Sequence, residues 1–205
     1  MKNFFISGIG TNVGKTVVSA ILTEALNADY WKPVQTGCAD GRDTDVVKSF
    51  ISNSKSVFHN EVYCLKEALS PHLAAKKENV LISCDKINLP VTTNKLIIEG
   101  AGGPLAPLNE KDFVIDLAKK FEAPIILVVN NYLGCINHSL LCIDYLLSKD
   151  FKLHGLILNG NFDEEVEKSI CNYKPVKVLA KIPFTFSPNI YFISQQAKQI
   201  NVSLF

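Results

Sequence analysis

The sequence predicts one α/β domain over residues 1–205, built on a mostly parallel, doubly wound sheet. Short β-rich apolar runs alternate along the chain with stretches whose apolar residues recur at helical spacing, an order typical of this class. Runs such as residues 125–129 are apolar at every position, as strands covered on both faces are. With 205 residues, of which 47% are hydrophobic, the chain has enough apolar material for one core, and it contains no repeat or clear linker.

Each element is predicted from the period of its apolar residues and from the Gly, Asn or Pro that ends the run. Strands are predicted at residues 3–7, 30–35, 96–99, 125–130, 155–159 and 177–182. Helices are predicted at residues 14–26, 45–51, 112–121, 136–147, 163–172 and 194–199. Residues 53–95 are the least regular part of the chain, with one helix expected at 70–77 because Pro71 suits a first helical position.

The charge balance and the short apolar runs argue against a nucleic-acid-binding protein and against a membrane protein. Lys and Arg number 21 against 20 for Asp and Glu, so the formal net charge is +1 and there is no broad attraction for nucleic acid or anionic lipid. No apolar run approaches the roughly 18 residues that cross a bilayer, and the apolar N-terminal stretch is too short for a secretory signal. We therefore expect a cytoplasmic protein that binds neither nucleic acid nor membrane.

The six cysteines lack a recognisable metal or redox spacing. They are Cys38, Cys64, Cys84, Cys135, Cys142 and Cys171, and no two form a C-x-x-C pair. In a cytoplasmic protein such residues are expected to be free thiols, mostly buried.

The turn after the first strand has the composition of a phosphate-binding loop. It begins at Gly8 and ends in Gly14-Lys15-Thr16, between a predicted strand and an amphipathic helix. Glycines let backbone N–H groups converge on an anion, the lysine reaches the terminal phosphates, and the threonine hydroxyl is a ligand for Mg²⁺. Five residues, rather than the usual four, separate Gly8 from the Gly-Lys-Thr. The motif predicts a P-loop NTPase-like fold that binds ATP or another nucleoside triphosphate with Mg²⁺, through Asn12, Val13, Gly14, Lys15, Thr16 and Val17.

A P-loop also needs a carboxylate beside the metal ion. Glu99 ends an apolar strand and is followed by the small residues Gly100, Ala101 and Gly102, which allow backbone to approach a ligand. Asp45 is a second candidate, but its position before a helical pattern also suits an N-cap, a role for which Asp43 competes. The spacing leaves the choice between metal ligand and cap open.

Lys32 lies between Trp31 and Pro33 at the end of a predicted strand. This setting favours an anion-binding role over a lysine whose stem packs on the sheet while its amine reaches water.

Together these blocks resemble the dethiobiotin synthetase family over residues 5 to about 183. The resemblance is carried by the Gly8–Thr16 spacing, by Lys32-Pro33-Val34, Ser70-Pro71-His72 and Glu99-Gly100-Ala101-Gly102-Gly103, and by the most specific block, Leu133-Gly134-Cys135-Ile136-Asn137-His138. It implies that ATP and Mg²⁺ drive the carboxylation and cyclisation of 7,8-diaminononanoate with CO₂, through a phosphorylated carbamate.

The resemblance also implies roles for individual residues. Lys32 and Lys15 match the catalytic positions, while Thr16, Asp45 and Glu99 match the metal ligands. The 99–102 loop lies along ATP and substrate in the family, and Thr36 contacts substrate. The family is homodimeric, and Gly134, Cys135, Ile136 and Asn137 match a helix start that holds the substrate carboxylate in the partner's site. His72 is as easily a surface residue as a substrate contact.

The family reads adenine with an Asn after a late strand and with a Pro segment further on. Asn159 and Pro183 match these positions, and Phe184 follows where Trp is common. Residues 184–205 contain no Asp or Glu, so the family's acidic contact to the base has no counterpart.

Three other functions share parts of this pattern. A partitioning or metal-delivery ATPase often has an extra lysine early in the loop, but residues 8–13 contain none. A GTPase needs an Asn-Lys-x-Asp motif, and residues 130–133 lack its Lys and Asp. A small-molecule kinase differs only in its product.

Overall fold

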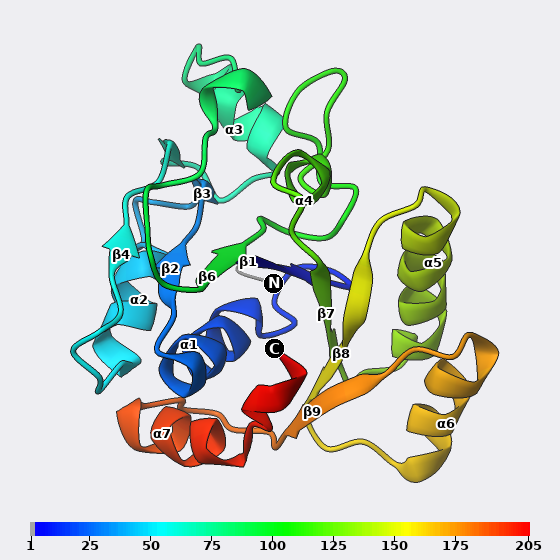
Figure 1. Cartoon of the computed structure of the whole chain (residues 1–205). Helices are drawn as coiled ribbons and strands as arrows, with labels where there is room; N and C mark the ends of the chain where they lie inside the picture. The colour runs from blue at the N-terminus through cyan, green and yellow to red at the C-terminus, as the bar shows by residue number, and fades with distance from the viewer. Residues whose placement is uncertain (1–2) are drawn as a thin grey trace.

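The computed structural model describes residues 3–205, which form a seven-stranded, all-parallel sheet in the order β4-β2-β6-β1-β7-β8-β9 (Figure 1). Its strands are β1 (Asn3–Gly8), β2 (Asp29–Trp31), β4 (Phe58–His59), β6 (Leu96–Glu99), β7 (Ile125–Asn130), β8 (Leu153–Asn159) and β9 (Val178–Ile182). A separate two-stranded parallel sheet pairs β3 (Val34–Thr36) with β5 (Tyr63–Leu65). The predicted α/β class with a mostly parallel sheet is confirmed.

Helices cover both faces of the main sheet (Figure 1). One face carries α1 (Lys15–Leu26), α2 (Asp43–Phe50) and α7 (Ile190–Gln199), and the other carries α4 (Asp116–Lys120), α5 (Cys135–Ser148) and α6 (Glu164–Tyr173). Helix α3 (Pro71–Lys77) packs on β3 and β5, and two 3-10 turns, η1 (Cys84–Lys86) and η2 (Val202–Leu204), complete the elements. Among residues 3–205, no helix is both long and apolar enough to cross a membrane.

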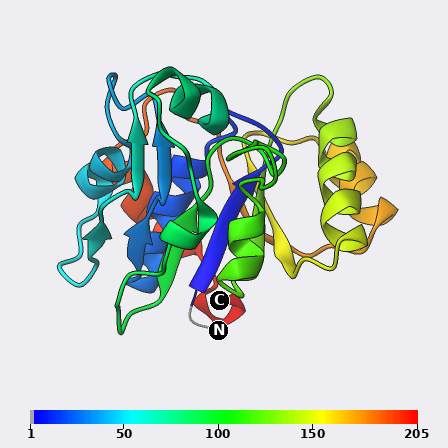
Figure 2. The ribbon, with the colours of Figure 1, turned by 90° about the horizontal axis from the view of Figure 1, so that it is seen from above.

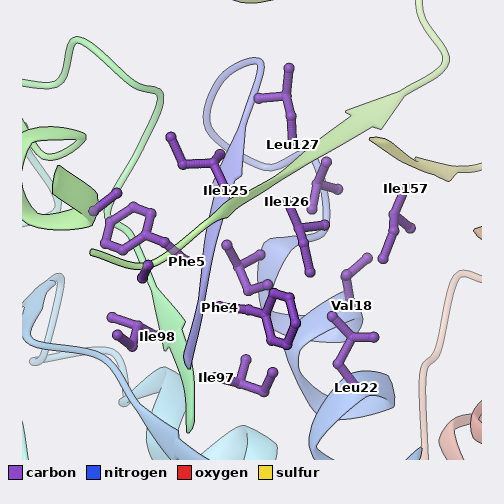
Figure 3. Packing of buried hydrophobic residues seen from close by; sticks show 14 of the residues in the cluster. Phe4, Phe5, Val18, Leu22, Ile97, Ile98, Ile125, Ile126, Leu127 and Ile157 are labelled. Carbon is purple, nitrogen blue, oxygen red and sulfur yellow. The ribbon is translucent and has the colours of Figure 1, made fainter. Parts of the chain in front are cut away.

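The central strands are buried on both faces, as their unbroken apolar runs predict. Phe4 and Ile97 point toward Val18 and Leu22 of α1, while Phe5 lies on the opposite side of the sheet (Figure 3). This alternation follows from the two-residue period of a strand, which sends successive side chains to opposite faces.

All strands of the main sheet run in the same direction, so their carboxyl ends meet at one edge. In Figure 2 the strands point toward the end of the molecule where α3 lies, and the loop between β1 and α1 lies at that same end. The elements expected to bind ligand are therefore brought to one edge.

The strand predicted over residues 30–35 is wrong, because the chain leaves the main sheet in the middle of it. Strand β2 ends at Trp31 and β3 begins at Val34 in the second sheet. Pro33 has no N–H to donate to a ladder, and its carbonyl accepts instead from the N–H groups of Val62 and Tyr63. The break leaves Lys32 at the junction of the two sheets.

The helix predicted over residues 112–121 is also too long, since α4 covers only Asp116–Lys120. The Asn109 side chain accepts from the N–H groups of Lys111 and Asp112, and the Asp116 carboxylate accepts from that of Phe113. These local side-chain bonds take donors that a longer helix would use.

The expectation of free, mostly buried cysteines is corrected by a disulfide between Cys38 and Cys64. Pairing of β3 with β5 sets Thr36 opposite Leu65 and brings the two cysteine Cα atoms to 5.9 Å, although 26 positions separate them in sequence. Of the remaining four cysteines, Cys135 is buried and Cys84, Cys142 and Cys171 are partly exposed.

We expect the disulfide to stabilise the fold by constraining the unfolded chain, so Cys64→Ser should lower the free energy of unfolding by about 3 kcal/mol. Cys64 is exposed, so the serine itself should cost little. Denaturant unfolding of the oxidised protein measures the loss. The free thiol Cys171 supplies the control variant Cys171→Ser, and addition of dithiothreitol should destabilise the control but not Cys64→Ser.

Candidate functional site

The loop between β1 and α1 has the backbone geometry of an anion site. Asn12 and Gly14 adopt positive φ values of 59° and 90°, which turn the chain into the N-terminus of α1. Lys15, the first residue of that helix, folds back so that its Nζ donates to the carbonyl of Gly10 at 3.0 Å. The lysine therefore spans the loop in which phosphates would bind.

The surroundings of Gly10 and Gly14 are consistent with a phosphate-binding loop. A Cβ on Gly10 would meet no atom within 4 Å, so the loop is open there. A Cβ on Gly14 would come within 2.0 Å of the Asn159 amide nitrogen, which donates to the carbonyl of Val13 at 2.9 Å. Asn159, at the end of β8, thus fixes the loop from a strand that is separated from β1 by β7 in the sheet.

Glu99, at the end of β6, is the centre of a buried polar cluster. Its Oε1 atom accepts hydrogen bonds from the Thr16 hydroxyl at 2.9 Å and from Lys32 Nζ at 3.1 Å. Its Oε2 atom accepts from the Tyr30 hydroxyl at 3.0 Å. The Glu99 side chain has no exposed surface, so these donors replace water around a buried carboxylate.

The structure brings Asp43, and not Asp45, to this cluster. Asp43 forms an ion pair with Lys32, and its backbone N–H donates to the Gln35 side chain at 3.2 Å. Asp45 lies two residues further along α2, where the turn of the helix directs it outward, and its exposed carboxylate pairs with Arg42 at 2.8 Å. In this arrangement Asp43 lies beside Lys32, while the assignment of Asp45 as a metal ligand stays a prediction.

The two lysines differ in how firmly they hold their charge. Burial lowers the pKa of Lys15 to about 8, although the Glu99 carboxylate opposes this. Burial also acts to lower the pKa of Lys32, but the charges of Glu99 and Asp43 outweigh it and raise the pKa. Lys32 is thus a fixed cation, whereas an approaching anion would strengthen the charge on Lys15.

Burial and the nearby charge of Glu99 raise the pKa of the Tyr30 phenol well above its ordinary value. The phenol therefore remains protonated and keeps donating to Glu99.

The donor set suits a Mg²⁺ ion that is held partly by its nucleotide. Within residues 3–205, no group of three or more His, Cys, Asp or Glu side chains forms a metal cage. Mg²⁺ is ordinarily bound by one or two carboxylates together with phosphates and water, and the Thr16 hydroxyl, Glu99 and Asp43 supply such a set. The residues present therefore fit the ion that the loop motif predicts.

A cavity of about 720 Å³ opens beside the loop. Its walls come from the phosphate loop (Ile9, Thr11), the end of β3 (Thr36), residues 68–71, residues 101–106, and the face of α5 that carries Leu141, Cys142 and Tyr145. Gly103 lies close to Gly10, since a Cβ added to Gly103 would be 3.6 Å from the Gly10 Cα atom. The predicted 99–102 loop and Thr36 therefore meet the phosphate loop at one cavity.

Gly134, Cys135, Ile136 and Asn137 form the start of α5 but do not line this cavity within the described chain. Gly134 has a φ of 107° and begins the helix, and Cys135 is buried while Asn137 is exposed. Later residues of the same helix, Leu141, Cys142 and Tyr145, do line it.

Pro183 follows β9 at the same edge of the sheet as Asn159, and the next aromatic residues are exposed. Phe184 and Phe186 pack edge to face, with ring centroids 4.6 Å apart. The sequence identified Pro183 and Phe184 but missed Phe186, which has no motif to mark it. Tyr30 was also missed, although its place two residues before Lys32 puts both on one face of the strand predicted over residues 30–35.

Comparison with known proteins gives one consistent family. A family model described as AAA domain matches residues 2–187. The ATP-dependent dethiobiotin synthetase BioD of Cytophaga hutchinsonii is 48% identical over 183 residues, which cover 89% of this chain and 88% of that protein. The protein of the same name from Christiangramia forsetii is 45% identical, over 88% of this chain and 87% of its own length.

Solved structures of low sequence identity share the fold. A ParA family ATPase from Chlorobium tepidum TLS superimposes with a TM-score of 0.60 at 11% identity, covering 96% of this chain and 97% of that one. A putative plasmid partition protein from Borrelia burgdorferi B31, bound to AMPPNP, gives 0.57 at 12% identity, covering 100% and 99%. At such identities the likeness concerns the fold alone, and it confirms the P-loop NTPase-like architecture.

We expect Gly14→Ala to lower the free energy of unfolding by about 2 kcal/mol, because alanine is strained at positive φ and its Cβ would displace Asn159. Gly10→Ala is the matched control in the same loop, where a Cβ meets no atom within 4 Å. Denaturant unfolding compares the two variants. Equal stability of both would contradict the close packing inferred between Gly14 and Asn159.

Proposed function

The chain belongs to the ATP-dependent dethiobiotin synthetase family, and on that premise we propose that it carboxylates and cyclises 7,8-diaminononanoate to dethiobiotin, with release of ADP and phosphate. The observation that carries the proposal is the pair of buried lysines, Lys15 and Lys32, which lie near the Glu99 carboxylate at the phosphate loop. Two cations at this point suit a reaction in which two anions must approach each other.

The proposed reaction has three steps. One amine of the substrate adds to CO₂ and loses a proton, which gives a carbamate. A carbamate oxygen attacks the γ-phosphorus of ATP, and the bond to ADP breaks. The second amine then attacks the carbonyl carbon of the mixed anhydride, phosphate leaves with the electron pair of the C–O bond, and loss of a proton completes the cyclic urea.

The residues contribute by binding and by neutralising charge. The phosphate loop and Lys15 would hold the β- and γ-phosphates, and Lys32 would lie against the carbamate and the transferring phosphoryl group. Ion pairs with Glu99 and Asp43 hold the Lys32 ammonium in place. Mg²⁺, when bound, would neutralise phosphate charge, with Thr16, Glu99 and Asp43 as its proposed protein ligands.

The cavity is the proposed site for the diamine chain, since apolar residues on α5 and in the 101–106 loop suit a hydrocarbon substrate. Thr36, at the cavity wall, is the proposed polar contact.

The substrate's carboxylate requires a partner, and we propose that a second copy of the chain supplies it. Backbone N–H groups at the start of α5 bind anions well, and residues 134–137 do not line the cavity of their own chain. Leu133 is fully exposed beside them and Leu141 is 61% exposed, as apolar residues of an interface would be in one isolated subunit. The proposed enzyme is thus a homodimer.

For the nucleotide base, Asn159 and Pro183 are the proposed contacts, with the exposed Phe184 and Phe186 as an apolar surface beside them. Aromatic rings stack on any base, so Asn159 would have to distinguish one nucleotide base from another through its polar side chain.

We propose a cytoplasmic location, where ATP and Mg²⁺ are supplied. In that compartment the cellular thiol pool would keep the Cys38–Cys64 disulfide reduced in a fraction of the molecules.

The function is tested by incubating the protein with 7,8-diaminononanoate, bicarbonate, Mg²⁺ and ATP and measuring dethiobiotin by mass spectrometry. We expect a product that depends on all four components. We also expect Lys32→Ala to lower turnover by about 100-fold, since it removes a cation beside the transferring phosphoryl group.

Lys48→Ala, an exposed lysine on α2, is the control and should leave turnover unchanged. Nucleotide hydrolysis without dethiobiotin would overturn the proposed reaction in favour of an ATPase. A stable phosphorylated product would instead indicate a kinase.

The dimer is tested by Leu133→Lys, which places a charge on the proposed interface. We expect it to weaken self-association by about tenfold or more, since burying one leucine contributes about 1.5–3 kcal/mol. Sedimentation equilibrium measures the effect. Leu81→Lys, 77% exposed in a distant loop, should leave association unchanged, and a wild-type monomer at all concentrations would contradict the dimer.

A further inference from the structure

We propose that Tyr30 is a positioning residue, which holds the Glu99 carboxylate so that one oxygen, Oε1, faces Thr16 and Lys32. This inference rests on the proposed function, in which Glu99 and Thr16 bind the Mg²⁺ of the nucleotide. The Tyr30 hydroxyl donates to Oε2 at 3.0 Å, and the other two donors, Thr16 and Lys32, both use Oε1.

The strand register explains why Tyr30 and Lys32 both come near Glu99. In the parallel pairing of β2 with β6, Tyr30 lies opposite Ile97 and Trp31 opposite Ile98, so Glu99 lies one position beyond the paired residues. Tyr30 lies within β2, and Lys32 lies just after its end, beyond Trp31. The phenol donates to one oxygen of the carboxylate, Oε2, and the ammonium donates to the other, Oε1.

Burial makes this contact an orienting one. Tyr30 and the Glu99 side chain have no exposed surface, so water cannot take the place of the phenol. A carboxylate held at only one oxygen can rotate about its terminal torsion, which has a broad energy profile. With Oε2 bound to Tyr30, Oε1 stays on the side of Thr16 and Lys32, both of which donate to it. That is the side of the phosphate loop, where a single-oxygen ligand for a metal is needed.

A merely structural hydrogen bond would predict something different. Tyr30→Phe keeps the ring and the packing, so either role allows some loss of stability. Only the positioning role predicts that the variant loses affinity for the metal, and that this loss requires the carboxylate of Glu99.

The test is calorimetric titration of the intact protein with ADP, with and without Mg²⁺, which measures binding rather than turnover. In the wild type we expect Mg²⁺ to strengthen ADP binding. In Tyr30→Phe that strengthening should fall about tenfold, the scale of one hydrogen bond to a charged group, while ADP binding without Mg²⁺ stays within twofold.

Two further variants make the result specific. Tyr63→Phe removes another phenol, whose oxygen accepts from the Ser83 N–H at 3.1 Å outside the site, and it should leave the Mg²⁺ effect unchanged. In the Glu99→Gln background, Tyr30→Phe should cause no additional loss, because a residue that acts through the carboxylate has nothing left to position.

Each other outcome overturns the inference. A wild-type Mg²⁺ effect in a folded Tyr30→Phe protein means that the phenol does not orient the ligand. If Tyr30→Phe still weakens the Mg²⁺ effect on ADP binding in the Glu99→Gln background, Tyr30 does not act through the Glu99 carboxylate. If Mg²⁺ does not change the ADP affinity of the wild type, the proposed metal site is wrong, and so is the inference.

Discussion

Glu99 imposes the main constraint on this molecule, because a carboxylate without solvent contact must be surrounded by donors. Its donors come from the start of α1, from β2 and from the junction after β2. Satisfying one buried charge therefore fixes the positions of the start of α1 and the end of β2 relative to β6. The same arrangement sets Lys32 and Asp43 where the proposed chemistry needs them.

The phosphate loop is held from the other side by a neutral contact. Asn159 donates to Val13 from the end of β8, and Gly14 gives it room. The loop thus lies between a charged cluster on β6 and β2 and an amide on β8. Parallel strands make this possible, since their carboxyl ends meet at a single edge of the sheet.

Sequence reasoning succeeded where the signal is local. The strand over Leu96–Glu99 and the first helix were predicted from their apolar period, and the loop from Gly14, Lys15 and Thr16 in strand-to-helix context. It was wrong where a partner distant in the chain decides the conformation. Residues 30–35 have the sequence pattern of one strand, but the Pro33 carbonyl accepts hydrogen bonds from the segment at the start of β5, and the strand is broken there. Cys38 forms its disulfide with Cys64 because β3 pairs with β5.

The sequence by itself determined the α/β class, the phosphate loop and the family, because these depend on apolar period and on short motifs within a few residues of one another. Only the tertiary structure decided that Asp43, and not Asp45, pairs with Lys32, because the two differ by about 200° around a helix whose orientation is set by packing. It also decided that Tyr30 meets Glu99, 69 positions away. Such contacts depend on strand register, and a register is fixed by the whole buried sheet rather than by any one segment.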